Sequence, residues 1–200
     1  MKQINTKKLI LKTALDFISK NGYAGVSIRQ IAREVGIRES AIYNHYKSKE
    51  EIFAAIMSDF KSRSVSREIL SDDLLDDLSN PQKFLKNFSK RLIQYWNGPD
   101  ERKFIRLLLI EQFTKIGSRD LSVSDYLTEL RSICKMIFTE MEKAGIIKEI
   151  DPAILAEEFI TPLFVMRVEK MSGDGGQDIK SIYDYSAKHV DFFWKAVANS

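Results

Sequence analysis

Apolar residues recur every three or four positions along most of the chain, and no segment alternates apolar and polar residues for long enough to predict a strand. The pattern therefore predicts an all-α fold. The expected helices cover approximately residues 5–21, 28–35, 39–46, 48–62, 81–96, 100–115, 124–144, 152–170 and 179–198. An acidic segment at 66–81 is predicted to be either a short helix or a linker.

Start and stop signals divide the first quarter of the chain into short helices. Gly22 predicts the end of the first helix, Ser27 is an N-cap for the second, and Gly36 separates the second from the third. Ser48 caps a fourth helix, and two glutamates lie in its first turn, where carboxylates favour the positive end of the helix dipole. We expect a small head at 1–50, a helical body at 51–200, and the helix at 48–62 as the link between them.

The second and third helices have complementary apolar faces. These faces consist of Ile28, Ile31, Ala32 and Val35 on the second helix, and Ala41, Ile42 and Tyr46 on the third. Both can share a small core with Phe17 of the first helix. Two short helices that cross steeply at a tight turn form a helix-turn-helix, which presents its second helix to the major groove of DNA.

This packing leaves polar side chains on the outer face of the third helix. They are Arg38, Ser40, Tyr43 and Asn44. Arginine can bond the O6 and N7 atoms of guanine, and asparagine can bond adenine. Tyr43, His45 and Lys49 have the reach and the donors to hold phosphates. Each also has a plainer interpretation, since Tyr43 can cover the small core while His45 and Lys49 can be solvated surface residues.

The charge distribution agrees with a polyanionic partner for the head. Residues 1–50 carry ten Lys or Arg against four Asp or Glu, whereas residues 51–200 carry 21 against 24. The overall net charge of +3 therefore combines a basic head with a mildly acidic body. A solvated, lysine-rich helix would give the same count.

The sequence lacks the signals of a membrane protein, a secreted protein or a zinc-binding protein. The apolar runs are shorter than the roughly 20 residues of a membrane span, and the N-terminus has no apolar signal core, so we expect a cytoplasmic protein. The one cysteine, Cys134, has no partner for a disulfide and no zinc-ligand spacing, and is expected to fill a core position. We expect no cofactor and no metal.

The segment "GYAGVSIRQIAREVGIRESAIYNHYKSKEEIF", at 22–53, resembles the DNA-binding signature of the tetracycline-repressor (TetR) family of bacterial transcriptional regulators. The resemblance implies that Ser27 and Lys49 contact phosphates, and that Tyr43 and His45 bind the DNA backbone or nearby base groups. It also places Arg38, Ser40 and Asn44 at base-reading positions.

Two residues depart from the family pattern. Arg38 lies where a Ser or Thr often caps the recognition helix. Glu39 is unfavourable near phosphates, although it suits a helix N-terminus and can accept a hydrogen bond from cytosine N4. Both residues bear on which operator sequence is read.

Two-fold symmetric DNA reading requires a homodimer, because two recognition helices must lie about 34–36 Å apart to occupy successive major grooves. The final helix has a large apolar stripe that can pair with the preceding helix and with the same two helices of a partner in a four-helix bundle, as the family resemblance implies. The expected interface residues are Phe159, Leu163, Ile182, Val190, Phe193, Trp194 and Val197. The alternative is an internal core without a dimer.

The helices between the head and this interface are rich in Phe, Met and Trp. In the family, such helices surround a small-molecule pocket, which needs mostly apolar walls with few polar anchors. The expected lining is Phe88, Leu92, Trp96, Phe104, Leu108, Gln112, Met136 and Met141. Ordinary core packing is the alternative for each of them. Pro162 is expected to kink the helix that contains it.

We therefore expect a regulator that binds a palindromic operator in double-stranded DNA, acts as a repressor, and is released by a small, largely apolar effector. One alternative is a DNA-binding regulator that is constitutive or controlled by a protein partner. The other is an α-helical enzyme, but the two histidines, His45 and His189, suggest no catalytic or metal constellation, so we expect no enzyme.

Overall fold

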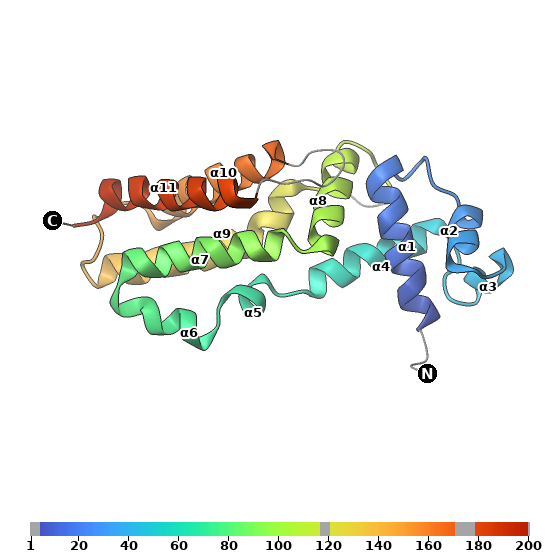
Figure 1. Cartoon of the computed structure of the whole chain (residues 1–200), viewed down its shortest axis with the longest axis horizontal. Helices are drawn as coiled ribbons and strands as arrows, with labels where there is room; N and C mark the ends of the chain where they lie inside the picture. The colour runs from blue at the N-terminus through green and yellow to red at the C-terminus, as the bar shows by residue number, and fades with distance from the viewer. Residues whose placement is uncertain (1–4, 117–120, 171–178, 200) are drawn as a thin grey trace. The chain divides into compact units, whose positions relative to one another are not determined.

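The computed structural model describes residues 5–116, 121–170 and 179–199, which form helices joined by short connections (Figure 1). No strand occurs among these residues, although an isolated antiparallel bridge joins Ile147 to Ala198. The all-α prediction is confirmed. No described helix is long and apolar enough to cross a membrane.

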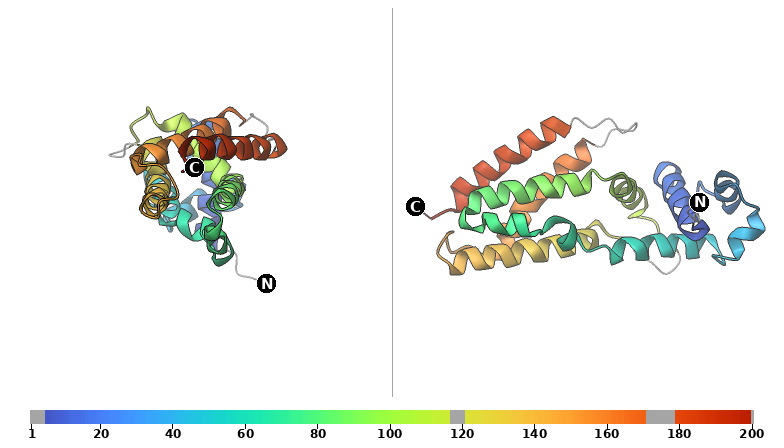
Figure 2. Two further views of the ribbon diagram at one scale, coloured as in Figure 1. Left: turned by 90° about the vertical axis from the view of Figure 1, so that its left-hand side faces the viewer. Right: turned by 60° about the horizontal axis from the view of Figure 1, so that its bottom comes forward.

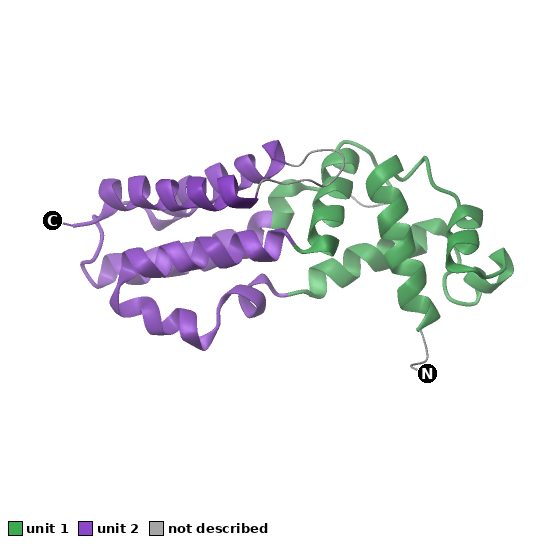
Figure 3. Ribbon diagram, viewed as in Figure 1, with its two compact units in different colours: residues 1–63, 98–126 green, residues 64–97, 127–200 purple. Residues whose placement is uncertain are grey.

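The chain divides into two compact units (Figure 3). Unit 1 contains residues 1–63 and 98–126, and unit 2 contains residues 64–97 and 127–200. Residues 98–126 therefore belong to the same compact unit as the N-terminal helices. The predicted boundary near residue 50 separates a DNA-binding head from a ligand-binding body by function, and it stays a prediction.

Unit 1 is built around its first helix. Its helices are α1 (Thr6–Asn21), α2 (Ile28–Val35), α3 (Glu39–Tyr43), α4 (Lys49–Ser62) and α8 (Pro99–Glu111). Figures 1 and 2 show α1 crossing α4, and α1 also contacts α2 and α8. Three α1 residues, Ile10, Ala14 and Ile18, are completely buried, so the apolar stripe of this helix is the centre of the core.

Helix α8 adds aromatic and ionic contacts to unit 1. The ring of Phe104 stacks on that of Phe60 in α4, with centroids 3.8 Å apart, and Lys103 forms a 2.7 Å ion pair with Asp16 of α1. The helix ends at Glu111, four residues before the predicted end, where the Thr114 N–H bonds the Glu111 carbonyl in a turn. Consequently Gln112 lies outside the helix.

Unit 2 contains α5 (Val65–Ile69), α6 (Asp72–Leu75), the 3₁₀ helix η1 (Asp76–Ser79), α7 (Pro81–Trp96), α9 (Val123–Lys143), α10 (Pro152–Glu169) and α11 (Ile179–Val197). The first four residues of α9 fall in unit 1. Helices α7 and α11 lie side by side (Figures 1 and 2). Helix α10 continues through Pro162 without a break.

Aromatic rings form the core of unit 2. Phe159 of α10 lies 5.6 Å from Phe138 and 5.2 Å from Phe193, measured between ring centroids, and both pairs meet edge to face. Cys134 of α9 is almost completely buried, and this burial raises the pKa of its thiol. The cysteine therefore occupies a core position, as predicted from the sequence.

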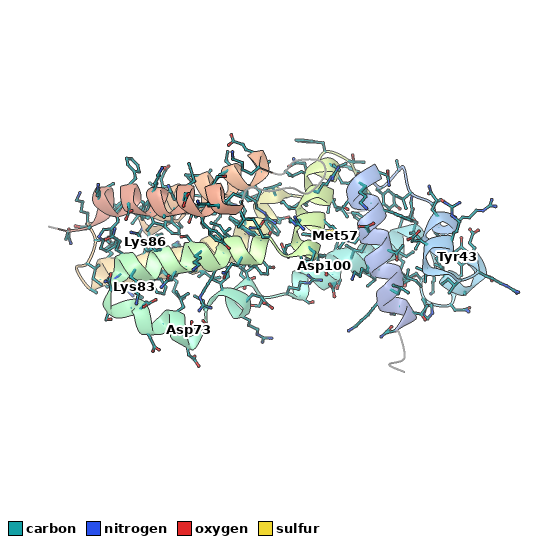
Figure 4. The ribbon with its side chains drawn as sticks, viewed as in Figure 1. Tyr43, Met57, Asp73, Lys83, Lys86 and Asp100 are labelled. Atoms are coloured by element: carbon teal, nitrogen blue, oxygen red, sulfur yellow. The ribbon has the colours of Figure 1, made fainter. Side chains whose placement is uncertain are left out.

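The acidic segment forms short helices that charged contacts hold against α7 and α9. The Glu129 carboxylate accepts hydrogen bonds from the backbone N–H groups of Val65 and Ser66, at 3.1 and 3.2 Å. Asp77 forms a 2.7 Å ion pair with Lys83, and Asp73 pairs with Arg91. Figure 4 labels Asp73 and Lys83 in this region. The segment is therefore helical rather than a linker.

Candidate nucleic-acid interface

Local interactions of the flanking residues Ser27 and Gly36 determine where helix α2 begins and ends. Ser27 and Gln30 form a capping box, in which the Ser27 Oγ accepts the Gln30 N–H at 3.2 Å and the Gln30 Oε1 accepts the Ser27 N–H at 2.7 Å. At the other end Gly36 adopts φ +78°, which glycine reaches without steric cost, and the Ile37 N–H bonds the Ala32 carbonyl at 3.0 Å. The turn between α2 and α3 is therefore fixed by local interactions.

Helix α3 packs on α2 through a few apolar side chains. Ile31 and Ile42 are completely buried, and Ala32 and Tyr46 are nearly so. The Ile42 carbonyl accepts the N–H groups of both His45 and Tyr46, at 2.8 and 2.9 Å. The helix consequently ends at Tyr43, before the predicted end at residue 46. The pair of helices forms the helix-turn-helix that the sequence predicted.

All the polar residues predicted to read DNA, apart from Lys49, are exposed to solvent. Tyr43, labelled in Figure 4, has 48% of its surface exposed. The other exposed members of the set are Ser27, Arg38, Glu39, Ser40, Asn44 and His45. Asn44 and His45 follow the last turn of α3 instead of lying within it. Their side chains are therefore accessible, and their roles as DNA contacts stay predictions.

Arg38 occupies the N-cap of α3 without capping it. Its backbone is extended and its side chain makes no capping hydrogen bond. Glu39 supplies a carboxylate in the first turn, where the helix dipole favours negative charge. A short helix that lacks a cap is less stable than a capped one, so the arginine side chain has no evident structural purpose here.

Lys49 is placed differently from the other predicted contacts. Its Nζ atom donates to the carbonyls of Tyr23 and Val26, at 2.9 and 2.8 Å, and lies 4.1 Å from the centre of the Tyr23 ring. The ammonium group is therefore engaged inside unit 1. It would have to leave two carbonyls in order to bind a phosphate directly.

Two carboxylates of unit 1, Asp16 and Glu50, are engaged in internal contacts. Burial opposes ionisation of Asp16, but its bonds to Lys103 and Lys20 outweigh that effect and lower its pKa. The pKa of Glu50 is lowered by its own backbone N–H and by the hydroxyl of Tyr23, which it accepts at 2.8 Å. Exposed cations on the head include Arg29, Arg33, Arg38 and Lys47. Between residues 27 and 47 these four cations stand against two exposed carboxylates, Glu34 and Glu39, so a net positive charge faces outward.

The predicted effector residues are distributed over both units. Phe88, Leu92, Trp96 and Met141 are buried in unit 2, Phe104 and Leu108 are buried in unit 1, and Gln112 is half-buried. Met136 is 55% exposed on α9, so it does not line an interior pocket of the chain. Its apolar side chain gave no sign of which face of α9 it occupies.

The predicted interface residues are mostly inside the chain. Phe159, Leu163, Ile182, Val190, Phe193 and Val197 are buried in unit 2, and Trp194 is half-buried. They therefore belong to the core of the single chain, because burying the largest apolar stripe stabilises the fold most. The exposed apolar residues of the same two helices are Ile154, Val165, Ile179, Tyr185 and Phe192.

The structure has a groove between α10 and α11 that was not predicted from the sequence. It has a volume of about 600 Å³, and Val165, Tyr185 and Pro162 line it. Small and polar lining residues, such as Thr161 and Ser181, carry no apolar signal of their own, which is why the sequence gave no indication of it. Among the described residues, no group of three or more His, Cys, Asp or Glu is placed to hold a metal ion.

Residues 10–56, which contain the helix-turn-helix, match the model of the bacterial regulatory proteins of the tetR family. This segment of the chain therefore resembles the DNA-binding domain of the TetR family. The match agrees with the regulator that the sequence predicts.

Relatives of the chain include other helix-turn-helix regulators. The uncharacterized regulator YerO of Bacillus subtilis (strain 168) is 32% identical over 108 residues, which cover 52% of this chain and 35% of YerO. The fatty acid metabolism regulator protein of the same organism is 25% identical over 161 residues, covering 80% of each chain. The chain thus spans only about a third of the first of these curated relatives.

A solved structure shows the same fold over nearly its whole length. The crystal structure of AibR in complex with isovaleryl coenzyme A and operator DNA superimposes with a TM-score of 0.67 at 21% identity, covering 92% of this chain and 96% of AibR. At this identity the likeness establishes the fold.

We expect Arg38→Ser to stabilise the protein while weakening any binding of DNA. The serine hydroxyl can cap α3, which should raise the free energy of unfolding by about 0.5–2 kcal/mol. Arg38→Ala is the matched control, because it removes the same guanidinium without providing a cap. Thermal and urea unfolding of the three proteins measure the difference; equal stability of the Ser and Ala variants would contradict an open cap position.

Proposed function

We propose that this chain is a DNA-binding transcriptional repressor of the TetR family that reads a roughly palindromic operator as a homodimer and is released by a small, largely apolar effector. The observation that carries the proposal is the set of exposed polar side chains on α3 and its N-cap, presented by a helix-turn-helix whose apolar face is buried.

The chemistry of this surface suits double-stranded DNA. Arg38 and Asn44 have the donor geometry for guanine and adenine edges, while Tyr43 and His45 can donate to phosphates. The exposed arginines of α2, Arg29 and Arg33, favour a polyanion at the same surface.

The homodimer is supported by the apolar side chains that α10 and α11 leave exposed. Phe192 is 74% exposed, Ile154 56% and Val165 47%, although each lies on a helix whose opposite face is well buried. The two helices that carry these residues pack on each other, and a contiguous exposed apolar surface is typical of association sites. The groove between the same two helices can accept side chains of a partner chain.

The effector proposal is supported by relatives and by the interior of unit 2. AibR was solved with isovaleryl coenzyme A, and another relative regulates fatty acid metabolism. In this chain Trp96 lies among buried aromatic residues, and the buried Arg167 donates to its carbonyl at 3.1 Å with its guanidinium 5.0 Å from the ring centre. An acyl compound with an acidic group matches both the apolar and the cationic chemistry.

We expect Tyr43→Ala to weaken binding to every operator variant alike, because phosphate contacts carry no base information. Arg38→Ala and Asn44→Ala should instead relax the preference at one base pair per half-site, by about 1–3 kcal/mol. The measurement is selection of genomic fragments by wild type, followed by titration of single-base variants. Failure of the wild type to enrich any sequence would refute specific DNA binding, and uniform losses for all three variants would refute the base-reading assignment.

Phe192→Glu should dissociate the homodimer and leave the fold intact, because it places a charge on the exposed face of α11. Light scattering should then give a molar mass near that of one 23.1 kDa chain, where the wild type gives about twice that mass. The neighbouring Phe193→Ala is the matched control: it empties a core position and should cost about 3–5 kcal/mol of folding stability. A dimer that survives Phe192→Glu contradicts the proposed surface.

An effector should weaken DNA binding by about 5–150-fold, and DNA should weaken effector binding by the same factor. Fatty acids and acyl thioesters are the compounds to screen, and calorimetry with and without operator measures the coupling. In a Trp194→Phe background, the remaining tryptophan, Trp96, reports whether the compound binds in unit 2. Binding that DNA leaves unchanged would favour the constitutive alternative.

A further inference from the structure

The loop between α1 and α2 is held from two sides. It runs from Gly22 to Val26, and Tyr23 is its most connected residue. The backbone N–H of Tyr23 bonds a residue of α8, whereas its carbonyl, hydroxyl and ring all contact α4. A short loop with this many contacts has little freedom of its own.

The contact from α8 is made by Glu111, the last residue of that helix. Its Oε1 atom accepts the Tyr23 N–H at 2.6 Å, although the two residues are 88 positions apart in the sequence. Only 5% of the Glu111 surface is exposed, so the carboxylate is removed from water and depends on its protein partners. Hydrogen bonds to ionised groups are among the stronger ones in proteins.

Gly22 allows this close approach. It adopts φ +72°, and a Cβ atom added there would lie 3.0 Å from the Glu111 Oε1. A larger residue would therefore press against the carboxylate as well as strain the backbone. The glycine and the glutamate fit each other across the junction between α1 and α8.

The contacts from α4 are made by three residues at its N-terminal end. Lys49 donates to the Tyr23 and Val26 carbonyls, Glu50 accepts the Tyr23 hydroxyl at 2.8 Å, and Phe53 meets the Tyr23 ring edge to face with centroids 5.2 Å apart. Burial and the bond to Glu50 both raise the pKa of Tyr23, so its hydroxyl stays a donor. Both ends of the loop are thereby fixed to α4.

This loop leads directly into the reading motif. Val26, whose carbonyl Lys49 holds, is buried and immediately precedes Ser27, the N-cap of α2. Helix α2 in turn fixes α3 through the Gly36 turn and their shared apolar face. A displacement of the loop would therefore change the direction of α2 and, with it, the position of every side chain on α3.

We propose that Glu111 and Lys49 are positioning residues for DNA reading, acting through the loop at 22–26. Glu111 holds the loop from α8, and Lys49 holds it from α4 without itself contacting a phosphate. The proposal rests on the proposed function, because it concerns how that DNA-reading surface is oriented. The proposal also explains why a carboxylate, that of Glu111, is buried in unit 1.

The test of Glu111 uses protein labelled with ¹⁵N at its seven tyrosines, so that hydrogen exchange of the Tyr23 amide can be followed alone. Glu111→Ala should accelerate that exchange by about tenfold or more, because the lost bond involves a charged acceptor. Glu111→Gln keeps an acceptor oxygen and should retain most of the protection. Lys103→Gln is the control, since it removes the ion pair between α8 and Asp16 of α1 without touching the loop.

Operator binding by the same proteins tests the functional step. Glu111→Ala should weaken binding by about tenfold, whereas the Gln and Lys103→Gln variants should stay within about twofold of wild type. Circular dichroism confirms that each variant is folded. Unchanged Tyr23 exchange in Glu111→Ala, or unchanged DNA affinity despite faster exchange, would overturn the positioning role of Glu111.

Lys49→Met separates positioning from phosphate contact. A direct phosphate contact would lower the dependence of log affinity on log salt by about one unit per contact, whereas a positioning residue should weaken binding without changing that slope. A reduced slope would overturn the assignment for Lys49. If the wild type binds no specific DNA, the proposed function fails, and the positioning role fails with it, even where Tyr23 exchange responds as expected.

Discussion

A helix of five residues has too few backbone hydrogen bonds to be stable by itself, so the position of α3 depends on the apolar packing beneath it. Ile42 is fully buried, as are Ile31 of α2, the helix on which α3 packs, and Ile10 and Ile18 of α1, on which α2 packs in turn. Helix α1 also packs against α4 and α8. A single buried surface therefore supports both the exposed polar residues and the helices that hold the adjoining loop.

Much of unit 1 could be predicted from the sequence because its signals are local. The capping box at Ser27, the left-handed glycine at position 36 and the carboxylates after Ser48 each act within one turn of the chain. Such interactions exist before any tertiary contact forms, so their residue types can be read without a structure. The family signature covers the same segment, which is why sequence and structure agree best there.

The remaining features depend on contacts between distant residues. On α10 and α11, apolar residues occupy more than one face, and periodicity alone cannot tell that Phe193 points inward while Phe192 points outward. Lys49 was expected on the DNA side because its charge is visible in sequence, but the Tyr23 and Val26 carbonyls that it meets are not. Likewise, nothing near Glu111 in the sequence indicates that it bonds a residue 88 positions away.

The buried Cys134 makes the chain convenient for thiol chemistry. It is the one cysteine in the sequence, and its burial both blocks reagents and disfavours the reactive thiolate. An alkylating reagent can therefore modify it only when α9 separates from its neighbours, and the rate of modification reports how often unit 2 opens. For the same reason, a cysteine introduced at an exposed position of the head would accept a fluorescent dye selectively, with no need to replace the native thiol.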